Sequence, residues 1–594
     1  MSEPAIIIPD ATATIPDVDQ TPVAPATSFL RHAKLIGGLT FISRIVGLAR
    51  EVVAGHYLGT GVVASAFTVA FTIPNLFRKL LGEGALSAAF IPLYAQANKR
   101  GTTEGGETAS DFAAASVNLL ALILLGITII GEAILLTLIA NWSPDRPDQV
   151  LMLQFTAVML PYVMLVCGGA FLSAILQVHH RFGPPAFAPI LLNVCHITVV
   201  IAGAWFLGLR GRDPLTPRVV ELQTQLAFAL AVTVLIAGVL QVAILLPALR
   251  AIGFRFRLPR PSPGFSPRSL FWSPTVRKML ILSIPVAIGA GVLQLSVLLD
   301  KGLSYALMQG VDAAGNLITH FDFFGSTIRF PMELGATRRL DLAQLLYQFP
   351  LGVFAIALAT AIFPSLSADA LDHDRDGFKR VLRQGIEATL WEGLPASIGL
   401  ILVAEPATRL LFQHGQISAH DCSLIARSTM VYAGAIWAFS LLQIVNRGYY
   451  ALHDTKTPLV MAGVNIVVNL IVEIPLLWWL GESAMAVGTV VSFSIQAIVM
   501  LWMLDRRVGG LELSRLARPA LKMLAATAVM AVVVWAIKAS PLYPIGATRA
   551  AWTMQLSLLL GMGVATYLAL SRLLGLETMR QLLPRRRSGE GRTG

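Results

Sequence analysis

Long apolar stretches recur along the whole chain and are separated by short polar connections. Each stretch holds about 20 residues, the length that an α-helix needs to cross the hydrocarbon core of a bilayer. The stretches cover residues 33–57, 62–95, 112–141, 150–177, 184–208, 221–249, 276–307, 341–368, 384–404, 424–450, 457–480, 484–504, 517–538 and 552–575. This pattern predicts an all-α polytopic membrane protein with about fourteen transmembrane helices.

Two short patterns recur at one and the same separation along the chain. The sequence Ala-Leu-Ser-Ala-Ala-Phe-Ile-Pro at 85–92 matches Ala-Leu-Ala-Thr-Ala-Ile-Phe-Pro at 357–364. The same separation relates Asn193 to Asn465, and both asparagines follow a polar turn that contains proline. Repeats of one orientation are typical of transporters whose substrate site lies between two lobes and which work by alternating access.

The repeat predicts two six-helix lobes, two further helices and three polar segments. Residues 1–28 are rich in Pro, Thr and Ala and lack the basic and apolar regions of a signal peptide, so we expect a disordered tail. In chain order the predicted segments are the cytoplasmic tail 1–28, the N-terminal lobe 29–250, a basic cytoplasmic linker 251–275, the C-terminal lobe 276–505, two extra helices 506–575 and a basic cytoplasmic tail 576–594.

Composition excludes a soluble domain, because 55% of the residues are hydrophobic, 13% are charged and the mean hydropathy is +0.69. Lys and Arg are concentrated on the side of the predicted helices where both termini lie, which predicts cytoplasmic termini. The net charge of +11 therefore indicates topology and contact with anionic membrane lipids, not nucleic-acid binding. The three cysteines are too few for a disulfide framework, and no spacing predicts a metal cluster.

Charged residues in the first two predicted helices are the strongest candidates for function. Arg44 and Glu51 lie about two helical turns apart and share a face, with Arg50 beside Glu51. The second helix adds Arg78 and Glu83. Charge at membrane depth is costly, and arginine binds phosphate oxygens bidentately, so this pattern indicates a cavity for an anionic ligand. The alternatives are arginines that reach the membrane interface and an ion-pair network that binds nothing.

A second polar group in the C-terminal half indicates a cation site. Asp300, Asn465, Asn469 and Thr489 would supply the oxygen ligands that Na⁺ prefers, and the two asparagines are about one helical turn apart. The competing interpretations are an ion pair of Asp300 with Lys301 near the outer interface and asparagines that bond helix to helix. We therefore expect Na⁺ or the membrane potential to drive transport. We expect no cofactor.

An ordered series of motifs surrounds the candidate residues. The first three are Ser43-Arg44-x-x-Gly47-x-x-Arg50-Glu51, Ala66-Phe67-x-x-Ala70-Phe71-x-Ile73-Pro74-Asn75-Leu76-x-Arg78 and Glu83-Gly84-Ala85-x-Ser87-x-Ala89-Phe90-Ile91-Pro92. Further pieces lie at 181–193, 349–353, 411–415 and 454–458. Over residues of about 30–575 the series resembles the MurJ (MviN) family of lipid II flippases, in the multidrug/oligosaccharidyl-lipid/polysaccharide (MOP) exporter superfamily.

The resemblance implies a monomeric flippase in the bacterial inner membrane that serves peptidoglycan synthesis. Its substrate would be undecaprenyl-pyrophosphate-linked disaccharide-pentapeptide, moved from the inner to the outer leaflet. The family's cavity arginines correspond to Arg44, Arg50 and Arg78, and its acidic position in the first helix corresponds to Glu51. With Asn75 and Glu83 of the same motifs, these are the expected substrate-binding residues. Flipping breaks no bond, so we expect no enzymatic activity, and the sequence contains no P-loop.

The chain departs from the family pattern at two charged positions. Ser65 stands where the family commonly has an aspartate, and Leu345 where it has an arginine. The lengthened connection 308–340 carries Arg329, Arg338 and Arg339. One of these could replace the missing arginine, or all could be surface charges of a solvated loop.

These departures leave other functions open. The chain could export another lipid-linked oligosaccharide, or act as a membrane scaffold that transports nothing. A multidrug antiporter is disfavoured, because cationic drugs would favour carboxylates over arginines.

Overall fold

The computed structural model describes residues 26–103, 108–142, 146–209, 216–254, 273–312, 314–353, 355–372, 374–541 and 543–578. The predicted tails 1–28 and 576–594 and the linker 251–275 lie almost wholly outside these ranges.

The first half of the chain forms eight α-helices and one π-helical segment. They are α1 (Ala26–Leu58), α2 (Val62–Phe77), η1 (Arg78–Ala85), α3 (Leu86–Arg100), α4 (Ala109–Asn141), α5 (Pro147–Met159), α6 (Tyr162–Val178), α7 (Gly183–Phe206) and α8 (Pro217–Ala251).

The second half adds ten helices and four short strands. The helices are α9 (Pro274–Ala306), α10 (Ala336–Val353), α11 (Ala355–Leu371), α12 (Arg375–Phe412), α13 (Ala419–Ala433), α14 (Ile436–Ala451), α15 (Lys456–Leu480), α16 (Ser483–Arg507), α17 (Leu513–Ala539) and α18 (Arg549–Leu573). The strands β1 (Gly310–Val311) and β2 (Leu317–Ile318) pair antiparallel, as do β3 (His320–Phe323) and β4 (Ser326–Arg329).

The all-α membrane fold is confirmed. Within the described ranges nine helices are long and apolar enough to cross a bilayer, or up to eleven if the bent pairs α5/α6 and α13/α14 each form one span. Each of the fourteen predicted stretches falls on a helix or a broken helix, but their number as membrane spans stays a prediction. The second stretch is interrupted at Gly84, whose φ of −95° and ψ of −107° are not helical and are tolerated by glycine.

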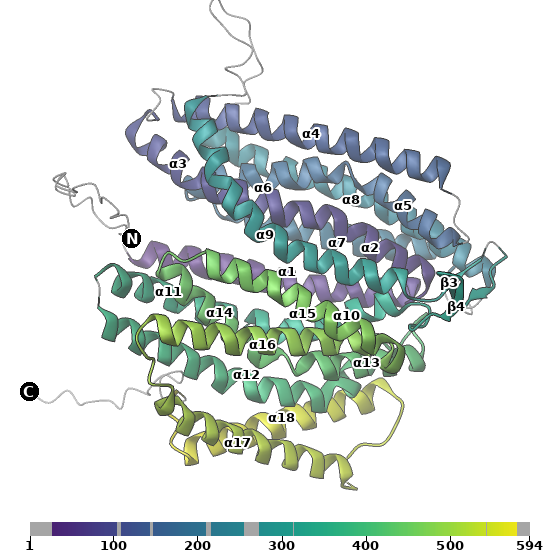
Figure 1. Ribbon diagram of the computed structural model, residues 1–594. Coiled ribbons are helices and arrows are strands. Elements are labelled where there is room, and N and C mark those ends of the chain that lie inside the picture. The colour runs from purple at the N-terminus through teal and green to yellow at the C-terminus, as the bar shows by residue number, and fades with distance from the viewer. Residues whose placement is uncertain are drawn as a thin grey trace, which may run out of the picture.

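Figure 1 shows the helices side by side in one long bundle. Helix α1 packs along α7, α7 along α8, and α2 along α5, while α12 packs against α13 and α14 and α15 against α16. The C-terminal pair α17 and α18 lies at the lower edge of the view and packs on α12. Helix α9 contacts η1, α3 and α2 on one side and α15 and α10 on the other, so it joins the two halves of the chain.

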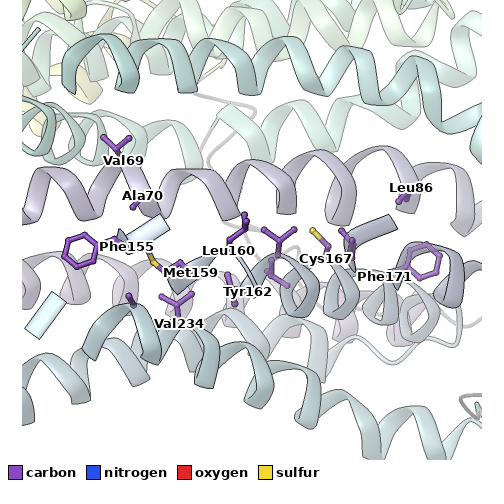
Figure 2. Close-up of a cluster of buried hydrophobic side chains, with 14 of the residues drawn as sticks. Val69, Ala70, Leu86, Phe155, Met159, Leu160, Tyr162, Cys167, Phe171 and Val234 are labelled. Atoms are coloured by element: carbon purple, nitrogen blue, oxygen red, sulfur yellow. The ribbon is translucent and has the colours of Figure 1, made fainter. Parts of the chain in front are cut away.

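Close helix packing in the first half positions the polar residues of a cavity. Phe155, Met159 and Tyr162 lie together in the buried cluster of Figure 2. A Cβ atom on Gly238 would lie 2.7 Å from the Tyr162 ring, so α6 and α8 can approach closely only because this residue is glycine. The Tyr162 hydroxyl donates to Gln241 Oε1 at 3.1 Å, and this bond fixes both side chains.

The connection between α9 and α10 is tied to both halves of the chain. Arg146, next to α5, donates to the carbonyl oxygen of Met308 at 3.1 Å and forms a buried ion pair with Asp148 at 2.8 Å. From α15, Trp478 Nε1 donates to the carbonyl oxygen of Arg329 at 3.2 Å. Strands β1–β4 of this connection mark one end of the bundle, called the hairpin end below (Figure 1).

Candidate functional site

A cavity of about 510 Å³ lies among the helices of the first half of the chain and is bordered by α9 and α10. Its wall contains five cationic and two acidic side chains, so positive charge is in excess. The charged side chains are Arg50, Glu51, Arg78, Lys79, Lys301, Arg338 and Asp341. Such a surface attracts an anion and repels cationic ligands.

Four of the predicted substrate-binding residues line this cavity: Arg50 and Glu51 from α1, Asn75 from α2 and Arg78 from η1. Arg44 is half-buried on α1 and is not part of the lining. Glu83 lies in η1, and its side chain is outside the described part of the molecule.

Glu51 bridges two arginines that come from distant parts of the sequence. Its Oε1 accepts from Arg50 Nε at 3.0 Å, and its Oε2 accepts from Arg338 Nη2 at 2.6 Å. Only 13% of the Glu51 side chain and 8% of the Arg338 side chain are exposed, so this ion pair is well shielded from solvent. Arg50 Nη1 also donates to Asn193 Oδ1 at 3.0 Å, which ties α1 to α7.

The ion pairs continue from α10 to α9. Arg338 Nη1 donates to Asp341 Oδ2 at 3.1 Å, and Asp341 also pairs with Lys301. A continuous chain of alternating charges therefore joins α1, α10 and α9 along one side of the cavity. Each acidic group is shared by two cations. The cationic side chains therefore still have N–H donors that can bind a further anion.

Of the three arginines that the sequence analysis offered as a replacement for the missing family arginine, Arg338 is the one that lines the cavity. It precedes Leu345 by about two helical turns and so lies on the same face of α10. Leu345 itself packs against the hydrophobic core, and Ser65 is buried and donates to the carbonyl oxygen of Thr60 at 3.2 Å. Neither residue lines the cavity. The interpretation of Arg338 and Arg339 as charges of a solvated loop is wrong, because both belong to α10 and are buried.

Arg339 connects several segments at the hairpin end. Its Nη2 donates to Glu482 Oε2 at 2.7 Å and its Nη1 to Asp421 Oδ1 at 3.1 Å, and Thr60 also donates to Asp421 at 2.9 Å. The buried guanidinium of α10 is therefore linked to the first turn of α13 and to the loop after α15, and through Asp421 to the loop after α1. Helices from both halves of the chain are thus connected at this end of the bundle.

A pair of histidines, one from each half of the chain, also lies in contact at the hairpin end. The Nδ1 atoms of His56 and His414 lie 2.9 Å apart, and His414 Nε2 lies 2.8 Å from the carbonyl oxygen of Leu411. Because a carbonyl only accepts, the neutral His414 ring carries its proton on Nε2 and accepts at Nδ1 from His56. Burial lowers the pKa of His414 and favours this neutral form.

The candidate cation residues Asp300 and Asn469 lie in contact, and the sequence analysis missed a third member. Asn469 Nδ2 donates to both Asp300 Oδ1 and Glu473 Oε2, each at 3.1 Å. Glu473 Oε1 and Asn469 Oδ1 are buried without a hydrogen-bond partner among the described residues. Glu473 could have been found in the sequence, since it is a lone carboxylate in an apolar stretch one turn after Asn469.

The other two predicted cation ligands are close by. Asn465 is buried about one turn before Asn469 on α15, and Thr489 follows Gly488, whose added Cβ would lie 2.8 Å from Asn469 Oδ1. The donor set of carboxylate, amide and hydroxyl oxygens fits a hard cation such as Na⁺. Within the described ranges no group of three or more His, Cys, Asp or Glu side chains could hold a metal ion.

Comparison with known proteins places these features in one family. A family model described as "Lipid II flippase MurJ" matches residues 54–548. A "Probable lipid II flippase MurJ" of Rhizobium tropici is 31% identical over 560 residues, 92% of this chain and 95% of the relative. A "Lipid II flippase MurJ" of Burkholderia cenocepacia is 28% identical over 487 residues, 81% of this chain and 84% of the relative.

Solved structures show the same fold. A "Lipid II flippase MurJ, inward closed conformation" has a TM-score of 0.68 at 20% identity, over 92% of this chain and 100% of that chain. An inward-facing multidrug resistance MATE family transporter of the MOP superfamily has a TM-score of 0.60 at 13% identity, over 81% of this chain and 99% of that chain.

The Glu51–Arg338 pair is testable by a double-mutant cycle on the free energy of unfolding in detergent micelles. Glu51→Gln or Arg338→Met alone should destabilise the protein by about 1–3 kcal/mol, because each removes one of the two partners of a buried charge. The double variant should lose less than the sum, with a coupling of about 0.5–3 kcal/mol. Arg409→Met breaks the more exposed pair with Glu405 and, as control, should cost at most about 1 kcal/mol. Additive effects at Glu51 and Arg338 would contradict the pairing.

Proposed function

The chain belongs to the MurJ family of lipid II flippases, and from this membership we propose that it moves lipid II across the bacterial cytoplasmic membrane. The substrate is undecaprenyl-pyrophosphate-linked disaccharide-pentapeptide, carried from the inner to the outer leaflet for cell-wall synthesis. The protein is a multi-pass membrane transporter that acts as a monomer and catalyses no covalent reaction.

The observation that carries this proposal is the cation-rich cavity enclosed by apolar helices. A diphosphate cannot enter hydrocarbon without charge compensation, and Arg50, Arg78 and Arg338 supply planar guanidinium groups from three different elements. The polyprenyl tail needs no such compensation and stays in the lipid. The cavity therefore binds the charged diphosphate, a polar part of the substrate that the bilayer excludes.

Glu51 and Asp341 keep the cavity stable between transport events. They compensate part of the positive charge of Arg50, Arg338 and Lys301 through hydrogen-bonded ion pairs. Diphosphate oxygens accept hydrogen bonds in the same geometry as carboxylate oxygens, so the substrate takes up donors that Glu51 and Asp341 share. Entry of the anion then loosens the link between α1 and α10.

We place both termini in the cytoplasm, which makes the hairpin end the outer end. The contacts around Arg339 and the pair His56–His414 then close the cavity on the outer side and must separate for release into the outer leaflet. Alternating access consists of breaking this closure while the opposite ends of the two halves approach one another.

The transport is driven by Na⁺ bound at Asp300, Asn469 and Glu473. The two carboxylates share one amide donor, and the orphaned oxygens of Asn469 and Glu473 are suited to coordinate a cation. The membrane potential adds to this driving force, since a bound cation adds positive charge within the membrane.

The MATE-like fold alone would also suit a multidrug exporter. The cavity argues against it, because five cationic side chains repel cationic drugs. Export of another polyprenyl-diphosphate oligosaccharide is the second candidate, since the same guanidinium groups would bind its diphosphate.

The cavity arginines should be required for transport. Arg50→Ala, Arg78→Ala and Arg338→Ala should each abolish complementation of a flippase-depleted strain while the protein still inserts in the membrane. The Lys variants should rescue only partly, because an ammonium lacks the planar fork. Arg44→Ala tests whether this residue, which does not line the cavity, is also needed. Normal growth with the Ala variants of Arg50, Arg78 and Arg338 would refute the proposed function.

Cysteine labelling in intact spheroplasts tests the orientation. A membrane-impermeant maleimide should label Ser326→Cys in the hairpin and should miss Asp372→Cys between α11 and α12, since both positions are exposed and lie at opposite ends of the bundle. The parent is the control, because its own Cys167 and Cys422 are buried and Cys195 lies within a span. The reverse labelling pattern would overturn the assignment of both termini to the cytoplasm.

Sodium binding should appear as thermal stabilisation of the purified protein. At a Na⁺ concentration about tenfold above Kd, binding adds about 1.4 kcal/mol to stability and raises Tm by a few degrees relative to choline at equal ionic strength. Asp300→Asn and Glu473→Gln should remove this shift, whereas Asp376→Asn, at an exposed position on α12, should keep it. A shift of equal size in all three variants would show that Na⁺ acts elsewhere.

A further inference from the structure

One wall of the cavity carries no charge and combines aromatic rings with a histidine. Phe67 and Phe71 of α2 stack at 6.1 Å between ring centroids, and the ring of His196 on α7 lies 6.5 Å and 5.9 Å from them. All three residues line the cavity. Neither the diphosphate nor the cation site described above uses them.

His196 stands out on this wall because one of its ring nitrogens, Nε2, has no hydrogen-bond partner in the described part of the molecule. Only 4% of the residue is exposed, and its Nε2 atom is buried without a partner among the described residues. Buried polar atoms are normally paired, because an unpaired one loses its hydrogen bonds to water and gains none. A leucine would fill the same space in an apolar core without this cost.

The histidine lies directly beside the diphosphate-binding group. The Arg50 guanidinium is 6.0 Å from the Phe71 ring centroid, and the same ring contacts His196. Asn193, which accepts from Arg50, lies about one turn before His196 on α7. Arg50, Phe71 and His196 therefore form a continuous row of contacts along the cavity wall.

We propose that His196, Phe67 and Phe71 form a saccharide subsite that recognises the sugar attached to the diphosphate. This inference rests on the proposed function, since it concerns the same substrate. In a glycosyl diphosphate the first sugar is bonded directly to the phosphate, so it must lie next to the group that binds the phosphate. Aromatic rings pack against the C–H face of a pyranose, and the imidazole nitrogen bonds to a hydroxyl or acetamido group.

The subsite gives the cavity a selectivity that charge alone cannot provide. Arginines bind any polyprenyl diphosphate, including the carrier after its sugar has been removed. A buried nitrogen that is paired only by a sugar group favours the glycosylated lipid, because the carrier without sugar leaves the nitrogen unpaired.

The test is a binding comparison with two probes on the full-length protein in detergent. The probes are undecaprenyl diphosphate, which carries no sugar, and lipid II, measured by native mass spectrometry. His196→Leu should weaken lipid II binding by about tenfold and change undecaprenyl diphosphate binding by less than about twofold. His196→Gln keeps a hydrogen-bonding group and should retain most of the affinity for lipid II. Arg50→Ala should weaken both probes.

Cys195→Ala changes the neighbouring residue on α7, which does not line the cavity, and should leave both affinities unchanged. If His196→Leu fails to fold, Phe71→Leu provides the same comparison. Equal affinities of parent and His196→Leu for lipid II, or an equal loss for both probes, would overturn the saccharide subsite and leave the flippase proposal intact. If the parent binds neither probe, the proposed function itself fails.

Discussion

Charge compensation at membrane depth is the constraint on which the rest of this structure depends. An isolated guanidinium in a largely apolar bundle is costly, and the chain meets this cost by linking α1, α10 and α9 through Glu51 and Asp341. Removal of one member leaves its neighbours as uncompensated charges. The substrate therefore enters a set of ion pairs in which the cations are only partly compensated.

The same requirement explains why consecutive arginines at the start of α10 have different roles. Arg338 faces the cavity and pairs with Glu51, while Arg339 faces the loops of the hairpin end and pairs with Glu482. Neighbouring residues of a helix point about 100° apart, so one helical turn reaches both environments. A rotation or shift of α10 consequently alters the substrate cavity and the closure of the hairpin end together.

The sequence predicts the helices well because each apolar stretch is a local property of about 20 residues. It also predicts Arg50, Glu51 and Arg78 as cavity residues, because their spacing within one or two helices determines which side chains lie together. It leaves Arg338 open between a replacement for the missing arginine and a surface charge, because the position of this residue depends on the contact of α10 with α1 across almost three hundred residues of chain. Glu473 was missed although it lies one turn from Asn469, and the unpaired nitrogen of His196 is visible only once the contacts of its ring with Phe67 and Phe71 are known.

Helix α9 connects the two charged sites through adjacent residues. Asp300 accepts from Asn469 beside Glu473, and Lys301 pairs with Asp341, the second acidic group of the cavity. Asp300 and Lys301 leave the same segment of α9, so a shift of this segment relative to α15 would change the geometry at both contacts. Because Asp341 also holds Arg338, this segment of α9 links the proposed cation site with the cations of the cavity, and if the binding of one ligand affects the binding of the other, the effect is reciprocal.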